Sequence, residues 1–187
     1  MNSNYLSITL GPITRIISLA ESTKELWAAS YFFSYLAKQL IKPFKEREFL
    51  LPKVNEEMWG QFHGAGVFPD KYIFKAEPDD FENLNSHVDN VLSIIAVNIG
   101  NLIIKPAPEI YSFLKSTLKI YFFEKELSLN EKKDIVKECE HTLNLIEMQD
   151  SFPSRIEDGE NFLSSLFKNI NGNPVFDKDT KKIKWFH

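Results

Sequence analysis

The stretch Tyr5-Leu6-Ser7-Ile8-Thr9-Leu10-Gly11-Pro12-Ile13 decides the fold of this chain. Leu6, Ile8 and Leu10 alternate with less apolar neighbours, and a period of two predicts a half-buried strand over residues 5–10. The Gly-Pro pair ends this strand, because proline has no N–H to donate to a strand ladder. A helical pattern follows at once, so the chain is predicted to begin with a strand that feeds a helix.

The helical pattern runs from Ile13 to Ile41, with a break or kink predicted near Glu21. Ser22 and Glu25 have the spacing of a capping box, so the main helix is predicted over 22–42. An apolar stripe is expected to face a sheet: Leu19, Leu26, Ala29, Phe33, Leu36 and Leu40. A neighbouring stripe has mostly small side chains: Ala20, Thr23, Trp27, Ser30, Ser34 and Ala37. This second stripe is either closely packed on the sheet or a surface for another backbone or a flat ligand.

The rest of the chain adds three predicted strands, at 48–51, 70–76 and 119–124. A long helix is predicted over 80–103, capped by Asp79 or Asp80, with further helices after Pro106 and Ser128. The order strand, helix, strand, strand, helix, strand is that of the ferredoxin-like, split βαβ fold. We therefore predict an α+β fold with a four-stranded antiparallel sheet, helices 22–42 and 80–103 on one face, and C-terminal helices.

Residues 1–150 are predicted to form one domain, and residues 151–187 a helical or irregular extension. Within the extension, 162–170 has an amphipathic helical pattern and 175–185 has the pattern of a hairpin.

The composition is that of an ordinary globular protein, with 43% hydrophobic and 26% charged residues among 187. The formal net charge of −4 provides no global attraction to nucleic acid. One cysteine, Cys139, excludes an internal disulfide and fits a reducing cytoplasm. No secretory signal and no apolar stretch of roughly 18 residues is visible, so a cytoplasmic location without a membrane span is expected.

Three pieces of sequence carry a resemblance to a known family: the Gly11-Pro12-Ile13 turn, the helix with Leu26-Trp27-Ala28-Ala29-Ser30 and Ser34, and the segment from Gly64 to Phe74. Over about residues 4–148 the chain resembles the first palm domain in the large subunit of type III CRISPR effector complexes, of the Cmr branch. The resemblance implies a polymerase- or cyclase-like palm that faces a second palm. In such subunits ATP binds between the palms, and cyclic oligoadenylate is made in antiviral defence when target RNA is bound.

The same resemblance implies the partners of the chain. These are the remaining domains of the large subunit and other Cmr-type subunits, with CRISPR RNA and target RNA contacted only indirectly and no membrane involved.

The carboxylates of a catalytic palm are missing here. The first strand has no acidic residue from Tyr5 to Gly11, and Phe68-Pro69-Asp70 stands where a catalytic palm has Gly-Gly-Asp-Asp. Two-metal catalysis needs carboxylates from both places. We therefore predict no catalytic residue and no metal ligand set in this chain, and we do not expect it to catalyse alone.

A nucleotide pocket is predicted at the end of the first strand. Its expected members are Gly11, Pro12, Ile13, Ser30, Ser34, Phe68, Asp70 and Lys71. The expected ligand is ATP with Mg, bound weakly because a second palm would complete the site. In the competing interpretation the Ser30 and Ser34 hydroxyls bond to backbone carbonyls one turn earlier.

Two further functions remain open from the sequence. The sheet could bind RNA by stacking bases on Tyr72, Phe74 and Tyr121, as ferredoxin-like RNA-binding domains do. The chain could also be a free-standing nucleotide cyclase, which the missing first-strand carboxylate disfavours.

Overall fold

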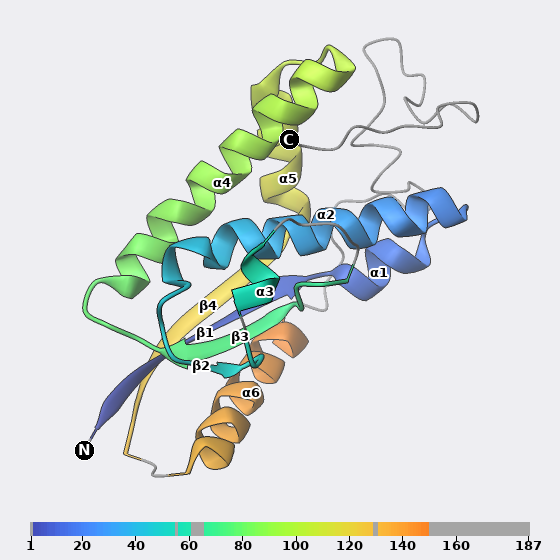
Figure 1. Ribbon diagram of the computed structural model, residues 1–187. Coiled ribbons are helices and arrows are strands. Elements are labelled where there is room, and N and C mark those ends of the chain that lie inside the picture. The colour runs from blue at the N-terminus through green and yellow to red at the C-terminus, as the bar shows by residue number, and fades with distance from the viewer. Residues whose placement is uncertain (1, 55, 61–65, 129–130, 150–187) are drawn as a thin grey trace.

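The computed structural model describes residues 2–54, 56–60, 66–128 and 131–149. Its strands are β1 (Ser3–Gly11), β2 (Phe49–Leu51), β3 (Lys71–Lys75) and β4 (Lys119–Leu127). Its helices are α1 (Ile13–Ser18), α2 (Thr23–Ile41), η1 (Lys42–Phe44, a 3-10 helix), α3 (Glu56–Trp59), α4 (Asp80–Ile103), α5 (Ala107–Thr117) and α6 (Lys132–Gln149). The order of strands and long helices agrees with the prediction (Figure 1).

The predicted extension at 151–187, with its helix at 162–170 and its hairpin at 175–185, lies outside the described residues. Gly64, which carried part of the family resemblance, also lies outside them.

The four strands form one antiparallel sheet in the order β2-β3-β1-β4. β1 lies inside the sheet, with Leu6 opposite Phe74 and Ile8 opposite Tyr72 on β3. Each of the two helical crossovers skips one position in the sheet, which is the ferredoxin-like arrangement. The predicted fold class is therefore confirmed.

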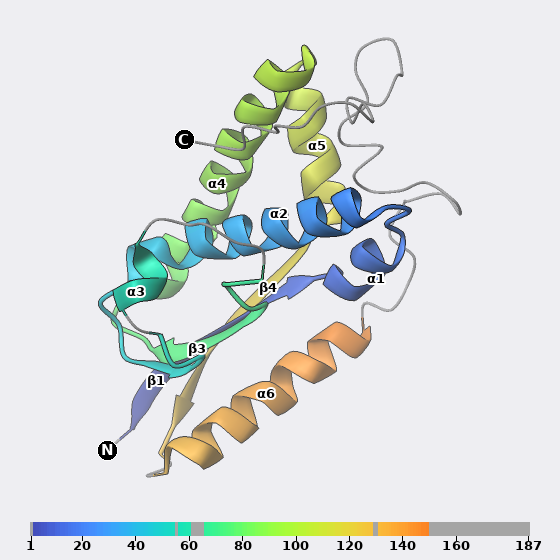
Figure 2. The ribbon, with the colours of Figure 1, turned by 45° about the vertical axis from the view of Figure 1, so that its right-hand side comes forward.

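Helices cover both faces of this sheet. Figure 2 shows α2 on one face and α6 on the other. Leu6 and Ile8 belong to the main core together with residues of α2 and α4. On the other face of the sheet, Tyr5 and Ile73 pack with Cys139 of α6. The prediction of a half-buried β1 is wrong, because α6 covers the second face and all residues from 5 to 10 are buried.

The break between α1 and α2 is held by the predicted capping residues. Ser22 Oγ accepts a hydrogen bond from the Glu25 N–H at 3.3 Å, and the Glu25 carboxylate accepts one from the Glu21 N–H at 2.7 Å. The Glu25 N–H lies in the first turn of α2, where a helix offers it no internal acceptor, and the Glu21 N–H lies just before the N-cap residue Ser22. The capping residues thus place the start of α2 where the sequence predicted it.

α2 buries its apolar stripe mainly in its C-terminal part. The buried members are Ala29, Phe33, Leu36 and Leu40. Leu26 was predicted in this stripe but is 43% exposed, because the first turns of α2 lie over α1 beyond the sheet (Figure 2). The small-residue stripe divides similarly, since Ser34 and Ala37 are buried while Trp27 is exposed. Close packing inside the domain therefore accounts for the C-terminal part of that stripe.

The side chain of Asp80, and not that of Asp79, fixes the start of α4. Asp79 occupies the N-cap position but makes no capping bond with its side chain. The buried Asp80 carboxylate accepts from Arg47 Nε at 2.8 Å, from Arg47 Nη2 at 2.9 Å and from the Glu77 N–H at 2.9 Å. Burial raises the pKa of Asp80, but these hydrogen bonds and the Arg47 charge outweigh burial and hold the pKa below its ordinary value.

Candidate functional site

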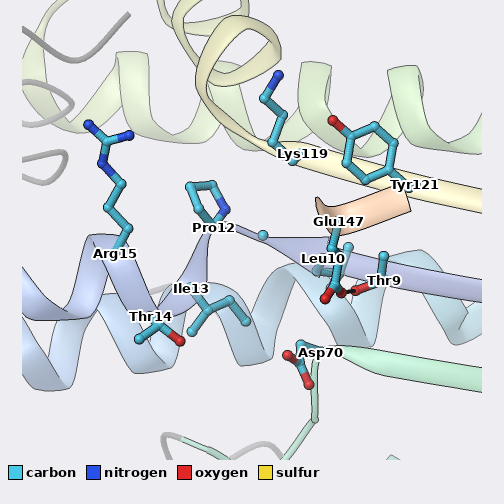
Figure 3. A pocket seen from close by; sticks show the side chains of 11 residues that line it. Thr9, Leu10, Pro12, Ile13, Thr14, Arg15, Asp70, Lys119, Tyr121 and Glu147 are labelled. Atoms are coloured by element: carbon cyan, nitrogen blue, oxygen red, sulfur yellow. Dashed lines mark hydrogen bonds between the residues drawn. The ribbon is translucent and has the colours of Figure 1, made fainter. Parts of the chain in front are cut away.

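A pocket of about 340 Å³ lies where β1 ends and α1 begins (Figure 3). Gly11 is opposite Lys119 and Thr9 is opposite Tyr121 in the sheet, while the Leu10 N–H donates to the Asp70 carbonyl at 2.9 Å. This register brings the ends of three strands to one place. The lining residues are Thr9, Leu10, Gly11, Pro12, Ile13, Thr14, Arg15, Asp70, Lys119, Tyr121 and Glu147.

Charges of opposite sign lie on different sides of this pocket. Arg15 and Lys119 extend to one side and flank Pro12 (Figure 3). The Asp70 and Glu147 carboxylates lie on the other side of the β1 end. Guanidinium and ammonium groups bind phosphate oxygens, whereas carboxylates accept from hydroxyl groups. Arg15 and Lys119 can therefore bind an anionic group on one side, and Asp70 can accept from a hydroxyl group on the other.

Glu147 holds α6 against the sheet beside the pocket. Thr9 Oγ1 donates to Glu147 Oε1, and Lys71 Nζ donates to Glu147 Oε2 at 3.2 Å and to Asn144 Oδ1 at 2.8 Å. Thr9 and Lys71 are opposite each other on β1 and β3, so one carboxylate bridges two neighbouring strands. Lys71 is thereby directed toward α6 and is not among the residues that line the pocket.

The predicted hydroxyl groups on α2 lie elsewhere. The buried Ser34 Oγ accepts a hydrogen bond from the Gly66 N–H at 2.8 Å. Gly66 has a φ of 75°, which favours glycine, and a Cβ placed on it would lie 3.9 Å from Ser30 Oγ. Phe68 is buried against Trp59, with ring centroids 5.8 Å apart. Within the described residues neither serine donates to a carbonyl one turn earlier, so Ser34 instead anchors the segment before β3 to α2.

The structure thus divides the predicted site into two locations. Gly11, Pro12, Ile13 and Asp70 line one pocket, and Lys71 lies next to it. Ser30, Ser34 and Phe68 are not part of that lining.

Seven further lining residues were not predicted as members of the site: Thr9, Leu10, Thr14, Arg15, Lys119, Tyr121 and Glu147. The ferredoxin-like order places the fourth strand beside the first, so Lys119 and Tyr121 could have been found from topology. Arg15 is three residues after Pro12, so its place in the pocket could have been predicted from its closeness to Pro12 in the sequence. Glu147 had no such signal, because the position of α6 depends on packing.

Residues 5–144 match the family described as CRISPR-associated protein Cmr2, N-terminal. The chain belongs to this family. It therefore represents the N-terminal region of a Cmr-type, type III CRISPR effector large subunit, and the family implies membership in a multi-subunit complex. No curated protein matches the chain.

The aromatic residues proposed for RNA stacking are placed differently in this Cmr2-family domain. Tyr72 and Phe74 are fully buried in the core under α2 and α4. Only Tyr121 lines the pocket, and it is partly buried. Bases stack on exposed aromatic faces, so the three residues cannot form a stacking platform on this sheet.

Tyr72 also carries a hydroxyl group inside the core. Its hydroxyl is buried and has no hydrogen-bond partner among the described residues. Burial raises the pKa of Tyr72, and the negative charge of Asp70 raises it further. Tyr72 is therefore a neutral core residue rather than a general base.

Among the described residues of this Cmr2-family domain, no three His, Cys, Asp or Glu side chains are grouped so that they could hold a metal ion. No helix in the same part of the chain combines the length and apolar character that a membrane span requires.

Proposed function

We propose that this domain is a non-catalytic palm that supplies half of an ATP-binding site in a Cmr-type large subunit. The pocket at the end of β1, with Arg15 and Lys119 on one side and Asp70 on the other, is the observation that carries the proposal (Figure 3). The rest of the subunit would complete the site through a second palm, for the synthesis of cyclic oligoadenylate in antiviral defence. The domain would also act as a scaffold that holds this half-site in place.

The pocket residues suit different parts of a nucleoside triphosphate. Arg15 and Lys119 would bind phosphate oxygens, which guanidinium and ammonium groups do through charge-assisted hydrogen bonds. Gly11 lets a ligand approach the backbone closely, since it has no side chain. Tyr121 and Pro12 offer flat apolar surfaces to a base, and Asp70 could accept from a ribose hydroxyl.

The residues of β1 and Glu147 explain why the domain alone would not catalyse a reaction of ATP. β1 presents Ser7 and Thr9 where a catalytic palm needs carboxylates, and Thr9 donates to Glu147. Glu147 is also paired with Lys71, so its oxygens are already engaged. Mg bound with ATP neutralises phosphate charge and activates a hydroxyl. In this protein the protein ligands of Mg would have to come from the facing palm, in addition to the ATP phosphates.

Titration of ATP with Mg into the chain, followed by amide NMR shifts, tests this proposal. We expect weak binding, with Kd on the order of millimolar, or about 4 kcal/mol of binding free energy. Shifts should gather at residues 11–15, 70 and 119–121. Arg15→Ala and Lys119→Ala should each weaken binding by about 3–10-fold, which is less than a buried charged hydrogen bond gives because solvent screens the site.

Lys133→Ala on the exposed side of α6 is the matched control for the loss of one positive charge. It should leave the affinity for ATP unchanged. Shifts that gather at Ser30 and Ser34 instead, or no shifts at saturating nucleotide, would contradict the proposed pocket.

The partner proposal can be tested separately by co-purification. Produced with Cmr-type subunits of its own organism, the chain should enter their complex, and CRISPR RNA should be recovered only when those subunits are present. Recovery of RNA with the isolated chain, reduced steeply by salt, would instead indicate direct RNA binding.

A further inference from the structure

The end of α6 is held to the sheet mainly by polar contacts. The earlier turns of α6 bury Ile135, Cys139 and Leu143. Beyond them, Leu145 and Met148 are 47% and 72% exposed. A helix end that buries little apolar surface opens locally at a low cost in free energy. The hydrogen bonds of this last turn therefore decide how firmly it stays beside the β1 pocket.

These hydrogen bonds form the α6 latch, as we name it, which consists of Thr9, Lys71, Asn144 and Glu147. Lys71 Nζ donates to Asn144 Oδ1 at 2.8 Å and to Glu147 Oε2 at 3.2 Å. Thr9 Oγ1 donates to the other Glu147 oxygen, as Figure 3 shows. The Lys71 and Glu147 side chains are 23% and 40% exposed, so water screens their ion pair. A charged ligand can therefore compete with this pair.

Glu147 connects the α6 latch to the pocket. It lines the pocket, whereas Lys71 does not, although Lys71 Nζ is within 3.2 Å of this lining carboxylate. The charges of the four ionised lining residues cancel, since Arg15 and Lys119 face Asp70 and Glu147. If Lys71 replaced Glu147 in the wall, a net positive charge would remain. A pocket in that state would attract a triphosphate more strongly.

We propose that the α6 latch regulates the proposed nucleotide site. The phosphate groups of the bound nucleotide draw Lys71 away from Glu147, and the last turn of α6 moves away from the pocket. The negative phosphates attract Lys71 and repel Glu147, so both forces open the latch. A ligand that binds the open state better shifts the chain toward it, and by linkage any contact that opens the latch raises the affinity for nucleotide. This inference rests on the proposed function.

Titration of ATP with Mg into the chain and its variants, followed by amide NMR shifts, tests the proposal. Glu147→Gln keeps an oxygen for Thr9 but loses the charge that holds Lys71. The affinity for ATP should rise by about 3–10-fold. Asn144→Ala removes the other acceptor of Lys71 and leaves the pocket lining intact, so the affinity should rise by about 2–3-fold.

Glu140→Gln is the matched control. It removes one negative charge from α6, and Glu140 is not among the residues that line the pocket. It should leave the affinity for ATP unchanged. A rise in this control equal to that in Glu147→Gln would show an effect of net charge alone and would overturn the proposal.

Two further measurements separate the α6 latch from a pocket that is merely wider. Glu147→Gln/Lys71→Met should lose the gain in affinity, because no ammonium group is then released toward the phosphates. Glu147→Gln should also tighten the binding of tripolyphosphate but leave that of adenosine unchanged. Equal tightening of adenosine, or a gain that persists without Lys71, would overturn the proposal.

Amide hydrogen exchange of the unsubstituted chain reports the movement of α6. At saturating ATP the amides of residues 145–148 should lose protection, whereas those of residues 135–143 should keep it. Unchanged or increased protection at 145–148 would overturn the opening of the latch.

The outcomes distinguish this proposal from the proposed function. If the unsubstituted chain binds ATP and Glu147→Gln binds it no more tightly, the latch is overturned and the nucleotide site stands. If no form of the chain binds ATP or tripolyphosphate, both proposals are refuted. Binding of tripolyphosphate that Glu147→Gln tightens, without any binding of ATP, would refute the nucleotide site and support the latch.

Discussion

Replacing Ser34 with alanine tests whether the α2 hydroxyl groups serve structure or nucleotide binding. Ser34 is 1% exposed, and its Oγ accepts the Gly66 N–H at 2.8 Å. This bond joins α2 to the segment that precedes β3, across 32 positions of sequence. Ser34→Ala removes the acceptor and changes little else, because alanine fits wherever serine does and favours a helix.

The magnitude follows from the burial of each partner. A neutral hydrogen bond contributes about 0.5–1.5 kcal/mol net, and a buried donor left without a partner costs about 1–3 kcal/mol. Gly66 is exposed, so water can reach its N–H after the substitution. We therefore expect the lower figure, about 1 kcal/mol of unfolding free energy, or a melting temperature about 2–4 °C lower.

Urea denaturation and amide hydrogen exchange measure this effect. The Gly66 amide should lose protection in Ser34→Ala, whereas amides in β1 should not. Ser30→Ala is the matched control, since Ser30 makes no hydrogen bond to Gly66, and it should change stability by less than about 0.5 kcal/mol. Affinity for ATP should be the same in both variants. Unchanged protection at Gly66, or a loss of ATP affinity in Ser34→Ala alone, would refute the reasoning.

Two further substitutions test the packing that holds α4. Asp80→Asn should lower the unfolding free energy by about 2–3 kcal/mol at pH 7, because Arg47 loses its buried carboxylate partner. The pKa of Asp80 is lowered in the fold, so its stabilisation exists above the ordinary carboxyl pKa near 4 and disappears as pH falls through the lower folded value. The deficit of the variant in urea denaturation should therefore shrink at pH 3; an equal deficit at pH 3 and pH 7 would contradict this. Gly100→Ala should cost about 1–3 kcal/mol in thermal unfolding, since its Cβ would lie 2.7 Å from the Lys105 carbonyl oxygen. Ser93→Ala, exposed on the same helix, should be neutral or slightly stabilising, and the same result for Gly100→Ala would refute the clash.

Much of the fold could be predicted because its signals are local. The spacing of Ser22 and Glu25 identified the start of α2: Ser22 caps the Glu25 N–H as expected, while the Glu25 carboxylate accepts from the Glu21 N–H rather than from that of Ser22. The burial of Leu26 could not be predicted in this way. Its periodic position is that of a core residue, but whether a sheet lies beneath the first turns of α2 depends on where β1 ends in space.

The candidate site was predicted only where its members are near β1. Gly11, Pro12 and Ile13 follow one another in sequence, and Asp70 is brought to them because β3 pairs with β1. Ser34 was assigned to the same site from its residue type. Its hydroxyl is engaged by Gly66 instead, an interaction that the spacing of small residues along a helix does not reveal.

The sequence by itself determined the order of the elements, the ends of α2 and the pairing of apolar faces with the main core, because alternation, helical periodicity and capping act between residues close along the chain. Tertiary structure alone decided that α6 covers the second face of the sheet and that Glu147 joins Thr9 and Lys71 beside the pocket. These contacts connect residues more than 70 positions apart. Their geometry depends on how whole helices pack on the sheet, and no short stretch of sequence contains that information.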